Sequence, residues 1–315
     1  MTRRPIVVAF LDAASLARPL VFDGAGNIDY RAFDSTTPDD VPQRVAEADV
    51  VVVNKVRLSA ANIASASRLK LICVAAAGTD NVDIEAARVR GIPVRNAPDY
   101  GSHSVAEHVV AVALALRRHL ATYSRAAVDG RWSASEHFCW HGPTIGDIGG
   151  ATMGIVGRGR IGEATARLAR GLGMRVVFAA HPESAGAGDE MPLEVLLAEA
   201  DIVSLHVPLT PETQGLIDAR RLALMKSTAL LVNTARGALV NVPDLLQALR
   251  TGQIGGAALD VLAFEPPPAD APVLHADLPN LLLTPHVAWA SESAQARLAE
   301  MVSDAVCGFA RTLDQ

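Results

Sequence analysis

The sequence predicts an α/β fold made of two Rossmann-like βαβ domains, each with a parallel sheet. Short apolar runs alternate with helix-like segments along most of the chain, an alternation typical of α/β proteins. Many of these runs are apolar at consecutive positions, which indicates strands covered by helices on both faces. The length of 315 residues, at roughly 150 residues per domain, indicates about two domains. The expected strands are 6–11, 50–53, 71–75, 153–156, 175–179, 202–205, 229–232, 257–259 and 281–283.

Two junctions that contain proline mark the expected domain boundaries. Asn96-Ala97-Pro98-Asp99 leads into a long helix expected at roughly 103–122, and Pro285-His286 precedes another at roughly 291–312. We therefore expect a flavodoxin-like substrate-binding domain at 1–98 plus 288–315, and a dinucleotide-binding Rossmann domain at 99–287. The chain would cross between them twice, which suits a hinge that closes over a substrate.

A weak internal repeat supports the two-domain interpretation. AEADVVVV (46–53) resembles AEADIVSL (198–205), and VAAAGTD (74–80) resembles VNTARGA (232–238). One interpretation is that any junction between a helix and a strand looks like this. The other is two similar domains facing one another, with the loops that end at Gly78 and Gly237 at matching strand ends. Those ends would then form opposite walls of an active-site cleft, because ligands of open α/β sheets bind beyond the carboxyl ends of strands.

Composition excludes several classes of protein. Lys and Arg number 28 against 34 Asp and Glu, a net charge of −6, so no basic excess favours nucleic acid as a partner. Cys73, Cys139 and Cys307 are widely spaced, which favours a reducing cytoplasm over a disulfide framework or a metal site. The longest apolar stretch, 105–116, is shorter than the ~20 residues that span a membrane. We expect a soluble cytoplasmic protein that acts on a small molecule.

A glycine loop predicts dinucleotide binding. Gly157-Arg158-Gly159-Arg160-Ile161-Gly162 lies between an expected strand and an expected helix. In G-x-G-x-x-G, the first glycine permits a tight turn, the second admits pyrophosphate and the third lets helix and strand pack closely. The N–H groups and the dipole of the helix then hold the phosphates. A plain glycine turn is the alternative, but the strand before and the helix after favour a nucleotide.

The end of the next strand bears on which cofactor binds. An acid at this point usually accepts a hydrogen bond from the adenosine ribose, but FAAHPES (178–184) has Ala180 there and its nearest acid, Glu183, three residues later. Without that carboxylate nothing repels a 2′-phosphate, and Arg158, His181 and Ser184 are the nearby groups that could bind one. We expect NAD(P) as cofactor, with a slight lean to NADP.

Three later segments carry the polar residues suited to chemistry. VNTARGALV (232–240) exposes Arg236, ALDVLAFEPPP (258–268) carries Asp260 and Glu265, and LLLTPHVAWAS (281–291) carries His286. Each follows an apolar strand, so we expect them at one edge of a sheet. Reduction of a 2-keto acid needs a hydride from nicotinamide and a proton, which a histidine oriented by a carboxylate can give. Arginine grips a substrate carboxylate with two parallel hydrogen bonds. Taken singly, each of these residues could instead be an ordinary surface charge.

These motifs resemble the D-isomer-specific 2-hydroxyacid dehydrogenases over nearly the whole chain. NTARG, DVLAFEP and TPHVAWAS carry the resemblance together with VGRGRIG and HVPLTPET. GSHSVAEHVVAVALALRRH and DGRWSASEHFCWHGPTIGDIGG resemble the glycerate dehydrogenase branch, whose members reduce hydroxypyruvate and glyoxylate. The resemblance implies that His286 is the catalytic histidine, Glu265 its partner, and Arg236 the residue that binds the substrate carboxylate and carbonyl.

The resemblance also implies which residues line the ligands. Ala76, Ala77 and Gly78 match the loop whose backbone N–H groups bind the substrate carboxylate, and Asp260 matches the acid that contacts the nicotinamide carboxamide. Together with the glycine loop, the expected cofactor-binding residues are Gly157, Gly159, Arg160, Ile161, Gly162, Ala180, His181, Val207, Pro208, Thr213, Thr234, Ala235 and Asp260.

The remaining histidines and the segment before the glycine loop also carry expectations. His103, His108 and His119 are interpreted as packing or interface residues of an apolar helix rather than as ligands. The segment around Cys139 and Trp140 resembles a dimer arm, so we expect a homodimer, and one hypothesis is that Trp140 reaches a neighbouring subunit's site.

The expected activity is NAD(P)H-dependent reduction of hydroxypyruvate and glyoxylate. The alternatives are a dehydrogenase for another 2-keto acid, such as phenylpyruvate or pyruvate, and a nucleotide-sensing corepressor of the same fold.

Overall fold

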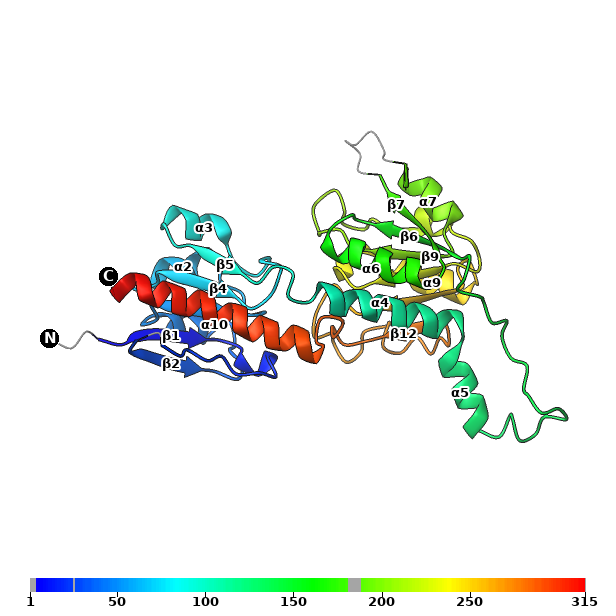
Figure 1. Cartoon of the computed structure of the whole chain (residues 1–315), viewed down its shortest axis with the longest axis horizontal. Coiled ribbons are helices and arrows are strands. Elements are labelled where there is room, and N and C mark those ends of the chain that lie inside the picture. The colour runs from blue at the N-terminus through cyan, green and yellow to red at the C-terminus, as the bar shows by residue number, and fades with distance from the viewer. Residues whose placement is uncertain (1–3, 25, 181–187, 315) are drawn as a thin grey trace. The chain divides into compact units, whose positions relative to one another are not determined.

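The chain forms two compact units, each built on its own sheet (Figure 1). The structure is a computed structural model and describes residues 4–24, 26–180 and 188–314. Unit 1 contains Met1–Gly101 and Ala290–Gln315, and unit 2 contains Ser102–Trp289. The expected boundaries after residues 98 and 287 lie slightly before these. Every strand pair among the described residues is parallel, which confirms the predicted α/β class.

Unit 1 is a five-stranded sheet in the order β2-β1-β3-β4-β5. All residues of β3 and β4 are buried, because helices cover both faces and only apolar side chains fit there. The long C-terminal helix α10, red in Figure 1, packs against β4. The elements are β1 (Ile6–Phe10), η1 (Ala13–Ser15), β2 (Ile28–Ala32), α1 (Val41–Val45), β3 (Val50–Val53), α2 (Ala60–Ser65), β4 (Leu71–Val74), α3 (Ile84–Val89), β5 (Val94–Asn96) and α10 (Glu292–Asp314).

Unit 2 is a seven-stranded sheet in the order β12-β11-β10-β9-β6-β7-β8. Helices α4 and α6 pack against one another, and their apolar side chains join one core cluster with strand residues such as Met153 and Val232. Residues of α7, α8 and α9 form a second cluster with other strand residues. The elements are α4 (Ser102–Arg117), α5 (Leu120–Val128), β6 (Thr152–Val156), α6 (Arg160–Gly171), β7 (Arg175–Ala179), β8 (Glu190–Met191), α7 (Leu193–Glu199), β9 (Ile202–Leu205), α8 (Ala219–Leu222), β10 (Leu230–Asn233), η2 (Gly237–Leu239), α9 (Val242–Arg250), β11 (Gly256–Leu259) and β12 (Leu281–Leu283).

The order of the strands in unit 2 places the predicted functional segments. The chain runs from β6 outward to β7 and β8, then returns to β9 on the other side of β6 and continues to β12. The crevice at such a reversal is where open α/β sheets bind ligands. The glycine loop follows β6, so it lies at this reversal, while the predicted catalytic residues follow β10, β11 and β12.

The prediction of a single helix at 103–122 is wrong, because two helices cover this range. Helix α4 ends at Arg117 and α5 begins at Leu120, with His119 between them at φ 49°. A residue in the left-handed region cannot continue a right-handed helix, so the chain turns at this point. In Figure 1, α5 and the segment after it project from the sheet of unit 2.

The projecting segment is ordered by its own contacts. Tyr123 donates a hydrogen bond to the carbonyl of Pro143 (2.7 Å), and its ring meets Trp140 edge to face at 5.5 Å. The guanidinium of Arg131 lies 4.9 Å from the centre of the Trp140 ring. Phe138, by contrast, is 92% exposed. Within this segment Trp140 therefore packs against Tyr123 and Arg131, while other apolar side chains such as Phe138 are exposed.

Candidate active site

The glycine loop has the backbone geometry that its spacing predicts. Gly157 adopts φ 110°, and a Cβ there would lie 2.6 Å from the carbonyl oxygen of His206. A Cβ on Gly162 would lie 2.1 Å from the carbonyl oxygen of Gly157. Both positions therefore require glycine. Gly159 is the N-cap of α6, and no heavy atom of the described chain other than those of its two neighbours lies within 4 Å of where its Cβ would be. This leaves space for a phosphate at the helix N-terminus formed by Arg160 and Ile161.

The predicted catalytic residues lie at the carboxyl ends of neighbouring strands. Arg236 follows β10, Asp260 and Glu265 follow β11, and His286 follows β12, and these three strands are adjacent in the sheet. A Cβ on Gly237 would lie 2.0 Å from the carbonyl carbon of Leu262. The loop that carries Arg236 is therefore packed directly against the loop that carries Glu265.

His286 and Glu265 form a close pair. His286 Nδ1 and Glu265 Oε2 are 2.5 Å apart, and Glu265 Oε1 accepts a hydrogen bond from the backbone N–H of Leu262 at 2.8 Å. An ionised carboxylate only accepts, so Nδ1 carries the proton and Nε2 is the nitrogen left for a substrate. Both side chains are partly exposed, at 26% and 32%. They line a cavity of about 380 Å³ together with Asp260, Leu262 and Thr284.

Asp260 organises the loop on which His286 lies. It is 3% exposed, and its carboxylate accepts hydrogen bonds from the Thr284 hydroxyl (2.5 Å) and from the backbone N–H groups of Val287 and Ala288 (both 2.9 Å). The backbone N–H of His286 donates to the Asp260 carbonyl at 2.8 Å. Thr284 was not among the predicted site residues, although its hydroxyl directly after the expected strand 281–283 was an available signal.

Asn233 is a second site residue that the sequence did not predict. It is fully buried at the end of β10, donates to the carbonyl of Arg236 (2.9 Å) and accepts from the N–H of Ala235 (3.1 Å). Its side chain thus shapes the loop that presents Arg236, whose Nη1 donates to the Ala235 carbonyl at 2.9 Å. Within the part of the chain that the structure describes, the buried Thr234 hydroxyl oxygen has no hydrogen-bond partner. A cofactor bound along this loop would supply one.

The loop after β9 lies beside the glycine loop and holds Val207, Pro208 and Thr213. The Thr213 hydroxyl donates to the Pro208 carbonyl and accepts from the N–H of Thr210, both at 2.7 Å. His206 Nε2 lies 2.8 Å from the Ser204 hydroxyl, and burial lowers the pKa of His206 to about 4. The predicted cofactor residues of this loop are therefore held in a fixed turn next to a neutral imidazole.

The predicted ribose end contains an ion cluster. Ala180 follows β7, and its N–H donates to the Met191 carbonyl at 2.8 Å; His181 lies outside the described residues. Arg158, in the glycine loop, stacks over Phe178 (4.5 Å). It also bonds to three carboxylates, on Glu163 (2.9 Å), Asp189 (2.8 Å) and Glu190 (3.1 Å). The hydrogen bonds that Arg158 donates to these carboxylates, the one to Glu163 most of all, raise the pKa of Arg158.

The predicted substrate loop of unit 1 follows β4. The Ala76 carbonyl accepts from the N–H of Ala97 (3.0 Å), and the Ala77 carbonyl accepts from the side chain of Asn96 (2.5 Å). These bonds tie the Ala76–Ala77–Gly78 turn to the strand beside it. The role of these three residues in substrate binding stays a prediction.

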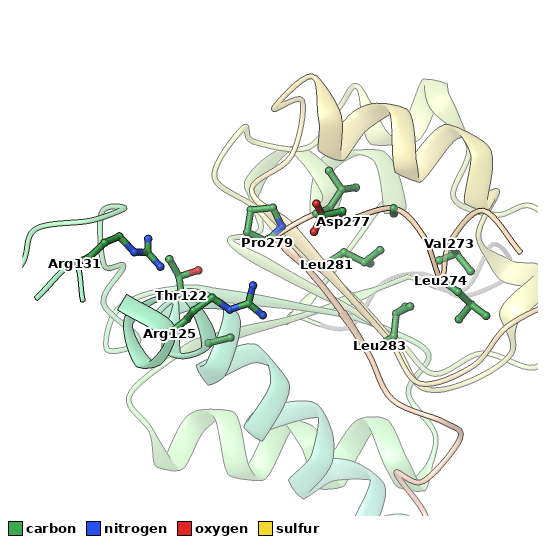
Figure 2. Close-up of a pocket in the computed structure, with 12 residues that line it drawn as sticks. Thr122, Arg125, Arg131, Val273, Leu274, Asp277, Pro279, Leu281 and Leu283 are labelled. Atoms are coloured by element: carbon green, nitrogen blue, oxygen red, sulfur yellow. The ribbon is translucent and has the colours of Figure 1, made fainter. Parts of the chain in front are cut away.

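A second cavity in unit 2, of about 490 Å³, contains none of the predicted site residues. Figure 2 shows Arg125 and Arg131 on the side of α5, with Asp277 and Leu281 on the opposite side. The described residues contain no cluster of three or more His, Cys, Asp or Glu side chains able to hold a metal ion. Among the same residues, no helix has both the length and the apolar character needed to cross a membrane.

Comparison with known proteins identifies the family. Residues 110–288, which include the glycine loop and the histidine loop, match "D-isomer specific 2-hydroxyacid dehydrogenase, NAD binding domain". The chain belongs to the D-isomer-specific 2-hydroxyacid dehydrogenases. It is an oxidoreductase of that family, and its cofactor is a nicotinamide dinucleotide.

This dehydrogenase has relatives that match it over most of its length. It is 44% identical over 307 residues to the glycerate dehydrogenase of Methylorubrum extorquens, covering 96% of this chain and 95% of the relative. It is 41% identical over 254 residues to the glyoxylate reductase of Korarchaeum cryptofilum, covering 78% and 75%. The structure of D-lactate dehydrogenase from Aquifex aeolicus with NAD and lactic acid superposes with a TM-score of 0.82 at 26% identity, covering 97% of this chain and 96% of that one. The resemblance and the enzyme class expected from the sequence are thereby confirmed.

Proposed function

We propose that this dehydrogenase reduces hydroxypyruvate and glyoxylate to D-glycerate and glycolate, reversibly, with NAD(P)H. The observation that carries the proposal is the 2.5 Å pair of His286 and Glu265 at the same sheet edge as Arg236. Relatives named glycerate dehydrogenase and glyoxylate reductase support the choice of small 2-keto acids.

Each residue of the site has a distinct task in this reaction. The nicotinamide, when bound, supplies the hydride. His286 gives a proton from Nε2 to the carbonyl oxygen, while Glu265 holds Nδ1 and stabilises the positive charge of the imidazolium before the transfer. Arg236 binds the substrate carboxylate with its planar donors and polarises the carbonyl. In the reverse direction the neutral imidazole accepts the proton of the alcohol.

The decisive experiment compares His286→Gln with wild type on hydroxypyruvate, glyoxylate, pyruvate and phenylpyruvate. Loss of the proton donor should lower kcat by about 100- to 10,000-fold and leave the cofactor Kd nearly unchanged. His275→Gln is the matched control, since His275 is an exposed histidine of the same unit. Undiminished turnover in His286→Gln refutes the mechanism. A wild type that prefers pyruvate or phenylpyruvate supports the alternative substrates, and a protein that turns over none of them supports the corepressor alternative.

We infer that the enzyme accepts both cofactors with a slight lean to NADPH, because Ala180 leaves no acid at the ribose position. Arg158 could bind a 2′-phosphate, but Glu163, Asp189 and Glu190 already occupy it. The double variant Asp189→Asn/Glu190→Gln should leave Arg158 paired with Glu163 alone and raise the NADPH-to-NADH ratio of kcat/KM by up to roughly tenfold, since a charge-assisted pair contributes about 1.5 kcal/mol. Glu199→Gln, an exposed partner of Arg175 in the same unit, should leave the ratio unchanged. A strong NADH preference of the wild type contradicts the lean to NADPH.

We also infer a homodimer that uses the projecting segment. Val128 and Phe138 are 84% and 92% exposed, and Trp132 is 52% exposed, and a gathering of exposed apolar side chains typically marks a protein interface. Light scattering should give twice the mass of the 33.0 kDa chain, and Phe138→Asp should shift the protein toward monomer.

If Trp140 serves a neighbouring site, Trp140→Ala raises the keto-acid KM, whereas an unaltered KM rejects that role. A cytoplasmic location stays a prediction.

A further inference from the structure

A chain of polar side chains joins helix α4 to the loop that presents His286. His108, on α4, places Nε2 at 3.1 Å from the Thr284 hydroxyl and 3.8 Å from Asp260 Oδ1. The Thr284 hydroxyl in turn lies 2.5 Å from the same Asp260 oxygen. The His108 side chain is 19% exposed and that of Asp260 1% exposed, so these contacts are made largely away from water.

The proton positions along this chain follow from chemistry. An ionised carboxylate only accepts hydrogen bonds, so the Thr284 hydroxyl donates its proton to Asp260. The Thr284 oxygen must then accept from His108, which requires the proton of the neutral His108 ring to be on Nε2. The Asp260 carboxylate therefore accepts a hydrogen bond from the Thr284 hydroxyl on Oδ1, in addition to those from the backbone N–H groups of Val287 and Ala288.

Helix α4 holds the same loop at a second point. Ser104, one turn before His108, donates to the carbonyl of Ala288 at 2.7 Å. The loop between β12 and residue 289 is thus fixed by α4 at Thr284 and Ala288, on both sides of His286.

The conformation of His286 needs such support. Its φ is 55°, in the left-handed region that a residue with a side chain rarely adopts and that typically costs about 1–3 kcal/mol unless the surroundings enforce it. Its N–H donates to the carbonyls of Asp260 (2.8 Å) and Thr284 (3.0 Å), and the following two N–H groups bind the Asp260 carboxylate. The direction of the imidazole therefore depends on where the Asp260 carboxylate lies.

We propose that His108 and Thr284 are positioning residues for the reaction: through Asp260 they hold the His286 backbone in the conformation that sets its imidazole against Glu265. The inference rests on the proposed role of His286 as proton donor. Nothing in the sequence marks His108 for this task, since its partner Thr284 is 176 residues away along the chain. The packing role expected for His108 from the apolar helix is replaced by a polar one.

The test removes the hydrogen-bonding side chain at either His108 or Thr284 and restores it at each position with a conservative substitution. His108→Leu removes the donor and Thr284→Val replaces the hydroxyl with a methyl group of equal size. His108→Gln and Thr284→Ser keep a donor and a hydroxyl. His103→Leu is the control, because His103 lies on the same helix but is 68% exposed and paired with Glu107.

The expected result is a split between kinetic parameters. His108→Leu and Thr284→Val should each lower kcat for hydroxypyruvate by about tenfold or more, since a small displacement of a catalytic group has effects of this size, while the keto-acid KM and cofactor Kd change less than about twofold. The conservative variants should recover most of kcat, and His103→Leu should match wild type. His108→Leu/Thr284→Val should be no slower than the worse single variant, because both act through Asp260.

Several outcomes overturn the proposal. Wild-type kcat in both His108→Leu and Thr284→Val does so, as do independent effects that multiply in the double variant. Failure of Thr284→Ser to exceed Thr284→Val also does so, and this pair decides the matter if His108→Leu does not fold. If His286→Gln is itself fully active, the proposed function fails instead, so the two failures are distinguishable.

Discussion

The sheets of the two units each contain five strands in corresponding order. They differ in the residues that follow the carboxyl end of the first of these strands along the chain, which is β1 in unit 1 and β6 in unit 2. β2-β1-β3-β4-β5 in unit 1 corresponds to β7-β6-β9-β10-β11 in unit 2. The repeated AEAD segment has the same function in both. Asp49 accepts a hydrogen bond from the N–H of Val7 (3.0 Å) at the start of β1, and Asp201 accepts one from the N–H of Thr152 (2.8 Å) at the start of β6. Of the two interpretations of the repeat, the structure supports two similar domains.

The difference lies in what occupies the crevice where the order of the strands reverses. In unit 1, the carboxylate of Asp12 follows β1 and accepts hydrogen bonds from the N–H groups of Asn54 (2.8 Å), Lys55 (2.6 Å) and Val56 (3.0 Å) after β3. In unit 2 the corresponding position begins the glycine loop, at Gly157. The first domain fills its crevice with its own anion, whereas the second keeps a turn into which a phosphate fits. The two units therefore differ at this corresponding position after the strand, which is an acid in unit 1 and a glycine in unit 2.

The largest effect expected from this comparison is that of a methyl group in the glycine loop. In Gly162→Ala the new Cβ meets the backbone oxygen of Gly157 at 2.1 Å, and backbone cannot yield as a side chain does. Overpacking of this kind should destabilise unit 2 by roughly 3 kcal/mol. We expect fluorescence titration with NADPH to show affinity weakened by about 100-fold or more. Gly171→Ala is the control, because Gly171 ends the same helix in open space. Equal cofactor affinity in the two variants would remove the structural reason for the third glycine.

A smaller effect is expected from the anion that fills the crevice of unit 1. Asp12→Ala leaves three backbone N–H groups without their acceptor. Leaving buried donors unsatisfied costs about 1–3 kcal/mol each, less where water enters the space, so we expect unit 1 to lose roughly 2–3 kcal/mol. Hydrogen exchange should accelerate at the amides of residues 54–56, while the cofactor Kd stays unchanged. Asp39→Ala, at an exposed position of the same unit, should change neither quantity. Weakened cofactor binding in Asp12→Ala would contradict the division of roles between the units.

The fold was predictable wherever burial alone dictates the sequence. The bounds of β3, β9 and β12 agree with prediction, because each is a short run made almost entirely of apolar residues. β2 was missed, since IDYRA is half exposed at the edge of its sheet and carries charge. The break at His119 was missed as well, because nothing in an apolar helical pattern reports a positive φ.

The candidate site likewise contains features that the sequence could predict and features that it could not. Arg236, Glu265 and His286 could be predicted, because each is a chemically specific residue directly after a strand. The contacts that hold them in place could not, because the partners are distant along the chain: Thr284 meets Asp260 across 24 positions and His108 across 176. Such contacts exist only once the sheet has formed, so sequence spacing carries no trace of them.

The smallest effect expected from the comparison concerns the repeated aspartates. Burial alone would raise the pKa of Asp49, but hydrogen bonds from Arg4, the Val7 N–H and Arg68 lower it to about 2. Asp201 is held in the same way by Thr152 and Lys226, which lower its pKa against the effect of burial. Two arginines act on a carboxylate that is 1% exposed in the first case, and one lysine on a carboxylate that is 19% exposed in the second.

The sign of the pH effect follows from this lowering. The unfolded aspartate has a pKa of about 3.9, so the contribution of Asp49 to stability is complete above that value and is lost as the pH falls toward about 2. We expect wild type to lose roughly 2 kcal/mol of unfolding free energy from this group between about pH 5 and pH 2. Asp49→Asn should be less stable than wild type at pH 7 but should lack that part of the acid sensitivity. Asp201→Asn should flatten the curve less, because its carboxylate is more exposed. Urea unfolding from pH 7 to pH 2.5, followed by hydrogen exchange in each unit, measures both slopes. Equal acid slopes in Asp49→Asn and wild type would show that the lowered pKa of Asp49 contributes nothing to the acid sensitivity of unit 1.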